Sequence, residues 1–281
     1  METVMISPEL LEEFEQYLVE AERGAGTIEK YLRDVRRFTA WLGMDAVTKV
    51  AAAEWKRQLC AGGYRPATIN SMLAALNSFF TFAGWNGCKV KYLRIQRRLF
   101  CDQNRELSRE EYERLLASAH ERGRERLALL MEAICSTGIR VSEVRYLTVE
   151  AANRQRAEVA LKGKIRTILL PGKLCRKLLK YARQQKIASG EIFLTRSGRG
   201  LSRRQIWAEM KGLCARAGVA CSKVFPHNLR HLFARTFYRA CRDVAKLADV
   251  LGHSSIETTR IYLVSAGAEH ARQLERLGLI S

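Results

Sequence analysis

The sequence predicts a mainly α-helical protein of two domains with one small β-hairpin. Apolar side chains recur at helical spacing along most of its 281 residues, between Ser, Thr, Pro and Gly residues that begin or end helices. One stretch, residues 157–171, instead alternates with a period of two around Gly163. Residues 88–106 lose the helical periodicity and gather basic side chains, which is typical of a linker. We therefore predict a helical domain at 1–87, a basic linker at 88–106 and a larger domain at 107–281.

The N-terminal domain is expected to be a bundle of four helices. Ser7 is placed to cap the first helix, with Pro8 at the first helical position, and Thr27 is expected to cap the second. A Gly-Gly pair ends the third helix and Pro66 opens the fourth. The helices are expected near residues 8–22, 28–42, 51–61 and 69–82.

The C-terminal domain is expected to begin with a helix that Ser108 and Glu111 open as a capping box. The next helix leads to a turn at Gly138. After the hairpin, a helix is expected at 174–186, and Ser202 is placed to cap another. The hairpin is thus the one β element expected within a helical domain.

The charge of the chain indicates a polyanionic partner. Net charge is +19 and the isoelectric point is near 9.9. The surplus is uneven: residues 1–103 carry +2, whereas residues 104–281 hold 34 Lys and Arg against 17 Asp and Glu, or +17. A basic surface can simply be solvated, but a surplus this concentrated favours phosphate binding. Composition alone leaves DNA, RNA and an anionic membrane open.

Several classes of protein are disfavoured. The eight cysteines are scattered without a CxxC pair or a Cys/His cluster of zinc spacing, which favours reduced thiols in the cytoplasm. The N-terminus is acidic and no apolar run approaches the ~18 residues of a membrane span, so secretion and membrane insertion are not expected. The sequence also lacks a phosphate-binding GxxxxGK[ST] loop and a nicotinamide fingerprint. We expect neither a metal nor another cofactor.

The segment from Phe225 to Tyr262 holds the strongest candidates for chemistry. His227 and Arg230 stand three apart on an expected helix, so both side chains can address one anion. His253 follows a glycine that breaks a later helical run, and Tyr262 comes nine residues after it. A Tyr hydroxyl near an Arg and two His is a candidate nucleophile for phosphoryl transfer. Each of these residues taken singly is more often structural or solvated.

The spacing resembles an active-site signature of the tyrosine site-specific recombinases, the phage-integrase and Xer families. Its second half is HxxR, then LGHSS, then TTxxY, here at 227–230, 251–255 and 258–262. The same families carry T-G-x-R-x-S-E, here Thr137–Glu143, and a Lys on a β-hairpin, here within Lys162–Lys164. Four segments in the family's order make a specific match.

The resemblance implies a fold and an activity. It implies a SAM-like core-binding domain followed by an α+β catalytic domain, in a compact, Xer-like architecture. The implied enzyme is a site-specific DNA recombinase or integrase, in which Tyr262 attacks a DNA phosphodiester to form a 3′-phosphotyrosyl link and release a 5′-hydroxyl. Arg140 and Arg230 would clamp the phosphate bidentately in the transition state.

The remaining catalytic roles also follow from the resemblance. Lys162 would protonate the leaving oxygen, with Lys164 as its rival because the hairpin departs from the family's commonest G-K-G-x-K-x-R form. His227 suits proton transfer at Tyr262, and His253 would hydrogen-bond the phosphate. Glu143 is expected to orient its neighbours.

Further basic residues are expected to contact duplex DNA. They lie on the second helix, in the linker, on the hairpin and at the start of the helix that Ser202 caps, where an N-terminus favours phosphate. They are Lys30, Arg33, Arg37, Lys89, Lys91, Arg97, Lys164, Arg203 and Arg204.

Self-association on DNA, from dimer to tetramer, is a further expectation from the family. The last residues carry an apolar edge that either covers the chain's own core or docks on a neighbouring protomer. It comprises Leu274, Leu277, Leu279 and Ile280.

Two alternatives remain at this stage. A type IB topoisomerase shares the tyrosine chemistry but acts without a partner protomer. A DNA-binding regulator would keep the scaffold without cutting, although six candidate catalytic residues argue against it.

Overall fold

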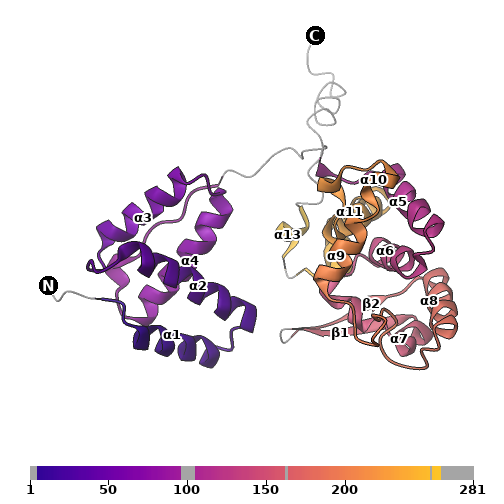
Figure 1. The fold of residues 1–281 in the computed structure, drawn as a ribbon, viewed down its shortest axis with the longest axis horizontal. Coiled ribbons are helices and arrows are strands. Elements are labelled where there is room, and N and C mark those ends of the chain that lie inside the picture. The colour runs from indigo at the N-terminus through magenta and orange to yellow at the C-terminus, as the bar shows by residue number, and fades with distance from the viewer. Residues whose placement is uncertain (1–4, 96–104, 162–163, 254, 261–281) are drawn as a thin grey trace, which may run out of the picture. The chain divides into compact units, whose positions relative to one another are not determined.

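A computed structural model describes residues 5–95, 105–161, 164–253 and 255–260 (Figure 1). The chain divides into two compact units, Met1–Arg97 and Arg98–Ser281. Helices dominate both, and the described strands form one two-stranded antiparallel sheet, which confirms the predicted fold class. Across the described residues, no helix has both the length and the apolar character needed to cross a bilayer.

The described residues of the N-terminal unit, 5–95, form four α-helices and a short 3₁₀ helix. They are α1 (Pro8–Glu20), α2 (Ala25–Leu42), α3 (Lys49–Ala61), α4 (Pro66–Phe82) and η1 (Asn86–Cys88). Ser7 caps α1 as expected, because its side chain accepts a hydrogen bond from the Leu10 amide. The expectation that Thr27 caps α2 is wrong. Its amide already donates to the Gly24 carbonyl at 2.7 Å, so the first turn has closed before Thr27.

Aromatic side chains form the centre of this unit's core. Phe14 meets Phe79 edge-on, with ring centroids 5.2 Å apart, and Phe38 meets Trp55 in the same way at 5.3 Å. All four side chains are buried. Edge-to-face pairs add about 0.5–1.5 kcal/mol beyond the area they bury.

The first part of the expected linker, residues 88–95, packs on the N-terminal unit. Val90 is buried, and its N–H and C=O both hydrogen-bond the Asn77 side chain, at 3.0 and 2.9 Å. Asn70 binds both backbone groups of Leu93 in the same way, at 2.7 and 2.9 Å. Two amides on α4 thus replace the strand partner that this extended segment lacks.

We expect Asn77→Ala to destabilise the N-terminal unit by about 1–3 kcal/mol, because it leaves the buried N–H and C=O of Val90 without partners. Urea unfolding measures the change. Asn86→Ala, at an exposed asparagine of η1, is the matched control and should change little. Equal losses in the two variants would contradict the assignment.

The C-terminal unit is a helical body with the hairpin at one side (Figure 1). Its helix α6 (Glu125–Thr137) buries most of its residues and packs against α5, α8 and α11. The capping boxes of Ser108 with Glu111 and of Ser202 with Gln205 both form. The other elements are α5 (Arg109–Glu121), η3 (Val141–Tyr146), α7 (Val149–Arg154), β1 (Arg156–Leu161), β2 (Lys164–Leu169), α8 (Gly172–Gln184), α9 (Arg203–Lys211), α10 (Cys214–Ala217), η4 (Cys221–Lys223), α11 (Pro226–Cys241), α12 (Val244–Leu251) and α13 (Ile256–Arg260).

The hairpin has an unusual distribution of side chains between its faces. Val159 pairs with Arg166, and both side chains point toward the body of the unit. Ile165 and Leu169 face away and are 80% and 76% exposed. The inner face of β2 is completed by the buried Ile168. The observed register therefore places an arginine inward and two large apolar side chains in solvent.

Candidate active site

Arg230 joins three segments of the C-terminal unit. It extends from α11 and is 1% exposed. Its guanidinium donates to the carbonyl of Gly138 at the end of α6 and to that of Leu251 at the end of α12, the latter at 2.9 Å. The same group lies 2.9 Å from Nε2 of His253. A buried charge is therefore met by backbone oxygens from two helix ends, where the helix dipole is negative.

Two glycines make these helix ends possible. Gly138 and Gly252 cap α6 and α12 with φ near +65° and +62°, a conformation that L side chains rarely adopt. A Cβ on Gly138 would lie 2.4 Å from Phe233 Cδ1, and one on Gly252 would lie 2.5 Å from Arg166 Cδ. Both positions thus require glycine for backbone conformation and for space.

Arg140 reaches the same turn from the other side. It precedes η3, and its guanidinium donates to Glu143 Oε1 at 2.9 Å and to the Gly252 carbonyl at 3.3 Å. Because Arg230 binds the carbonyl of Leu251, the two guanidiniums contact adjacent peptide units. The Arg140 side chain remains 39% exposed, so it is accessible to a ligand.

Glu143 is the acidic group of the site. It is 2% exposed and also pairs with Arg166, at 2.5 Å. Burial on its own would raise the pKa of Glu143, but the Arg140 amide hydrogen bond and the charges of Arg166 and Arg140 outweigh it and lower the pKa. Glu143 is therefore a fixed anion that orients two arginines, in keeping with its expected role.

His253 is held in a neutral form. Its Nε2 faces Arg230, and its Nδ1 lies 2.8 Å from Oγ1 of the buried Thr259 on α13. Since the guanidinium can only donate, Nδ1 carries the proton and donates to Thr259. Burial and the charge of Arg230, followed by Arg140, lower the pKa of His253 to about 4.

His227 lies at the surface beside this cluster. Its ring meets His231 edge-on, with centroids 4.6 Å apart. Partial desolvation and the charges of Arg230 and Arg140 lower the pKa of His227 below its ordinary value. The ring is therefore a neutral proton acceptor at pH 7.

Four of the six predicted catalytic residues thus share one region of the C-terminal unit: Arg140, His227, Arg230 and His253. Lys162 and Tyr262 lie outside the described residues. Sequence reasoning did not single out Arg166 or Thr259, although Arg166 ends the hairpin's K-x-R pattern and Thr259 belongs to TTxxY.

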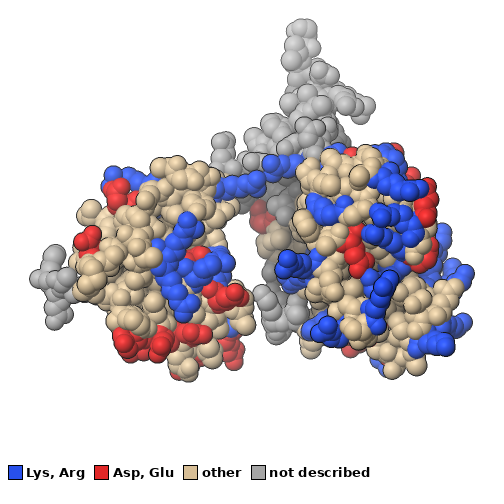
Figure 2. Space-filling view, viewed as in Figure 1, with Lys and Arg blue, Asp and Glu red and all other residues tan. Residues whose placement is uncertain are grey.

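The predicted DNA-contacting residues of α2 are partly engaged within the protein. Lys30 binds the buried carboxylate of Asp34 at 2.5 Å, and Arg33 reaches the same side chain at 3.3 Å. Arg37 lies over the Tyr64 ring and hydrogen-bonds its hydroxyl. Figure 2 shows Lys and Arg gathered where α2 and α4 lie in this view.

The other predicted DNA contacts are dispersed over both units. Lys91, Arg203 and Arg204 are exposed, the last two in the first turn of α9, and Lys89 is half-buried. Arg97 and the side chain of Lys164 lie outside the described part of the structure.

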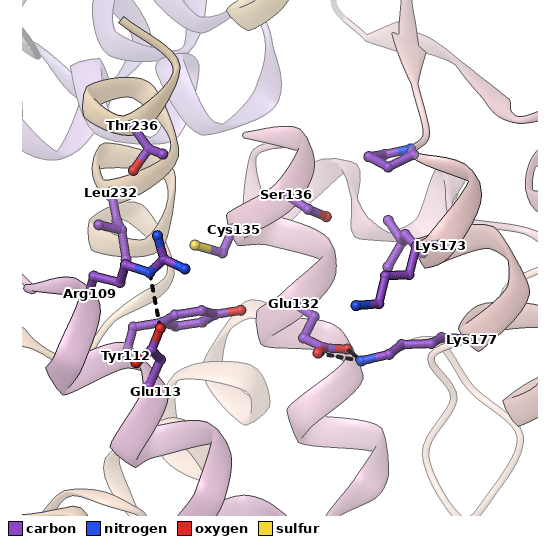
Figure 3. A pocket seen from close by; sticks show the side chains of 12 residues that line it. Arg109, Tyr112, Glu113, Glu132, Cys135, Ser136, Lys173, Lys177, Leu232 and Thr236 are labelled. Carbon is purple, nitrogen blue, oxygen red and sulfur yellow. Dashed lines mark hydrogen bonds and ion pairs between the residues drawn. The ribbon is translucent and has the colours of Figure 1, made fainter. Parts of the chain in front are cut away.

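A separate hollow lies between α5, α6, α8 and α11 (Figure 3). It measures roughly 430 Å³ and contains none of the predicted site residues. At its rim Arg109 pairs with Glu113 and Lys177 with Glu132, at 3.0 and 2.5 Å. Four of its charged groups are thus paired with one another.

The family profile described as Phage integrase family matches residues 105–269, more than half of the chain. The chain belongs to the phage integrase family. A second profile, the N-terminal SAM-like domain of phage integrases, matches residues 11–87 of this integrase-family protein.

Individual relatives cover nearly the whole of this integrase-family chain. It is 30% identical to Tyrosine recombinase XerA of Thermococcus kodakarensis over 277 residues, which cover 95% of this chain and 94% of the relative. Its fold resembles XerH bound to difH substrate, with a TM-score of 0.67, 22% identity and 95% and 84% of the two chains covered. It also resembles a lambda integrase tetramer bound to a Holliday junction, with a TM-score of 0.72, 17% identity and coverage of 90% and 76%.

The lowered histidine pKa values predict how stability depends on pH. An unfolded histidine titrates near 6.5, whereas burial and Arg230 lower the pKa of His253 to about 4. Between these values the unfolded chain binds more protons, so stability falls as pH drops from 6.5 toward 4 and is unaffected by this group above pH 7.

Thermal unfolding from pH 8 to pH 4 tests this. His253→Gln, which keeps a hydrogen-bonding side chain, should reduce the loss below pH 6.5. An unchanged pH slope would show that His253 does not titrate in this way.

Proposed function

We propose that this chain is a site-specific DNA recombinase that cleaves and rejoins strands through a 3′-phosphotyrosyl intermediate, with Tyr262 as the nucleophile. The main support is that Arg140 and Arg230 bind adjacent carbonyls of one turn. Membership of the phage integrase family supports the same activity. So does the similarity to a tyrosine recombinase over almost the full length of the chain.

The two arginines would stabilise the phosphoryl transition state. Attack by the Tyr262 oxygen makes phosphorus five-coordinate and increases negative charge on its non-bridging oxygens. Arg140 and Arg230 are already oriented by Glu143 and by backbone carbonyls, so little reorganisation opposes the reaction. Loss of one such donor raises the barrier by roughly 3 kcal/mol or more.

The histidines would manage protons around this charge. His227, neutral at pH 7 because partial desolvation and two arginines lower its pKa, would accept the proton of the Tyr262 hydroxyl. His253 holds Arg230 in the resting site. To hydrogen-bond the phosphate, it would exchange that contact and carry a proton on Nε2, because phosphate oxygens only accept.

A hairpin lysine would complete the reaction. As the phosphorus–oxygen bond to the 5′ side breaks, Lys162 would give a proton to the departing oxygen, with Lys164 as the rival donor. The bond energy is retained in the phosphotyrosyl link, so attack by a 5′-hydroxyl reverses the step without nucleotide hydrolysis.

DNA would be held by both units. We propose residues 1–87 as the core-binding domain, 88–106 as the connection and 107–281 as the catalytic domain. On α2, Asp34 neutralises part of the basic face, so Arg37 and the exposed Lys91 are stronger candidates for phosphate contacts than Lys30. In the catalytic domain, Arg203 and Arg204 at the N-terminus of α9 suit a phosphate.

Assembly on DNA would involve the C-terminal tail. The lambda integrase that this fold resembles forms a tetramer on a Holliday junction. The apolar residues Leu274, Leu277, Leu279 and Ile280 lie C-terminal to the nucleophile segment. Docking them on a neighbour would make the position of Tyr262 depend on a partner.

Tyr262→Phe should bind its site with unchanged affinity and form no covalent adduct, because only the nucleophilic oxygen is lost. The assay uses a nicked suicide substrate, with wild-type protein as the positive control. Undiminished adduct in the variant would refute the nucleophile. Adduct without strand exchange between two duplexes would favour a topoisomerase.

Deleting residues from Glu269 onward should preserve binding to one half-site and abolish cooperative binding and strand exchange. If the tail instead covers the chain's own core, the truncated protein loses about 1.5–3 kcal/mol for each apolar side chain exposed. Gel-shift titrations and thermal unfolding of the same truncated protein separate the two outcomes. Early unfolding or retained cooperativity would contradict docking.

A further inference from the structure

Apolar burial alone does not decide the register of the hairpin, because β2 carries large apolar side chains on both faces. Ile165 and Leu169 are 80% and 76% exposed, whereas the Arg166 side chain between them is only 17% exposed. Shifting β2 by one residue against β1 would turn Ile165 and Leu169 inward, but it would also turn the buried Ile168 outward together with Arg166. The apolar gain and loss oppose each other, so a polar interaction can decide the register.

The ion pair between Arg166 and Glu143 supplies that interaction. Nη2 of Arg166 lies 2.5 Å from Glu143 Oε2, and the carboxylate is 2% exposed. Shifting β2 would remove Arg166 from this buried carboxylate and leave Arg140 as its remaining ionic partner, which destabilises the shifted arrangement. Nε and Nη1 of Arg166 are buried without a hydrogen-bond partner among the described residues. Because these two nitrogens lack hydrogen-bond partners, burying Arg166 gains little in hydrogen bonding. The clearest effect of the residue is to specify the strand register.

Arg166 also contacts the turn that carries His253. A Cβ on Gly252 would come 2.5 Å from both Cδ and Nη1 of Arg166, so the arginine packs against this glycine. The Gly252 carbonyl accepts a hydrogen bond from Arg140, which shares Glu143 with Arg166. The hairpin is therefore anchored to the two segments that position the candidate catalytic arginines.

We propose that Arg166 is a positioning residue that locks the β1–β2 register and thereby places the hairpin lysine. The observed pairing joins Leu161 to Lys164, on either side of Lys162 and Gly163. A one-residue shift moves a strand by about 3.3 Å, and a misplacement near 1 Å already reduces catalysis by roughly 10²-fold. The catalytic part of this inference rests on the proposed role of Lys162; the register part does not.

Thiol labelling tests the register in the full-length protein. Ile165→Cys places a thiol at an exposed position, and its modification is followed by peptide mass. Labelling should be fast with Arg166 intact and at least about tenfold slower with Arg166→Met, as the side chain at position 165 turns inward. Arg156→Met, which removes an exposed arginine from β1, should leave the rate unchanged. Unchanged labelling in the Arg166 variant overturns the proposal.

Two controls cover a loss of folding. The buried Cys175 of α8 reports on the fold, because it should stay protected in every variant that folds. If Cys175 becomes reactive in Arg166→Met, the labelling is repeated with Arg166→Lys in its place. The Arg166→Lys variant keeps a cation beside Glu143 but loses the planar fork of the guanidinium. An unaltered rate of thiol labelling at position 165, together with unaltered cleavage in Arg166→Lys, would then overturn the proposal.

Cleavage kinetics test the catalytic consequence. Arg166→Met should cleave an ordinary suicide substrate roughly 10²-fold more slowly. A substrate with sulfur at the 5′-bridging position releases a thiolate that needs no proton, so it should restore the variant to within about tenfold of wild type. Lys162→Ala should show the same rescue, whereas Lys164→Ala should mainly weaken binding.

The outcomes separate the two proposals. The sulfur substrate could rescue Lys162→Ala but not Arg166→Met. That result would show that Arg166 acts on the phosphate or on the fold, and it would contradict the positioning role. Rescue of Lys164→Ala in place of Lys162→Ala would overturn the choice of lysine, while the labelling result still decides the register.

Discussion

The candidate site depends on one buried charge. Arg230 is 1% exposed, and a guanidinium removed from water without partners is strongly destabilising. Its partners are carbonyls at the C-terminal ends of α6 and α12, where the unsatisfied backbone oxygens of a helix carry partial negative charge. This explains why both helices end in glycine at positive φ, since the turns at Gly138 and Gly252 direct their last carbonyls toward one point.

The arrangement produces an excess of positive potential that the protein only partly neutralises. Glu143 is the buried acid of the cluster and contacts both Arg140 and Arg166, while Arg230 is met by neutral carbonyls and a neutral imidazole. Desolvation and the charge of Arg230 lower the pKa values of His227 and His253, and the second of these causes belongs to the same potential. A site that resists protonation of its histidines at pH 7 is suited to an anion whose charge grows during reaction.

Local patterns in the sequence predicted much of this. The three-residue spacing of His227 and Arg230 depends only on helix geometry, and capping at Ser108 depends on neighbours within one turn. The prediction for Thr27 failed because a helix can begin earlier on a glycine, without a side-chain cap. The inward face of β2 could not be predicted from alternation, because the ion pair that holds it joins residues 23 positions apart. Similarly, the partial neutralisation of Lys30 depends on the burial of Asp34, which its position on a basic helix face does not reveal.

The C-terminal region keeps a surplus of positive charge beyond what its acidic residues can neutralise. Several of its acids are already committed to single cations, including Glu111 to Lys223, Glu132 to Lys177 and Glu209 to Arg126. Even if each of the 17 acids between residues 104 and 281 neutralised one cation, half of the 34 Lys and Arg residues would remain. Such a surplus attracts any duplex through its phosphates and carries no sequence information. Discrimination between DNA sites must therefore arise from base contacts, from DNA deformation or from the geometry of assembled protomers, and the electrostatic surplus supplies the affinity on which those smaller differences act.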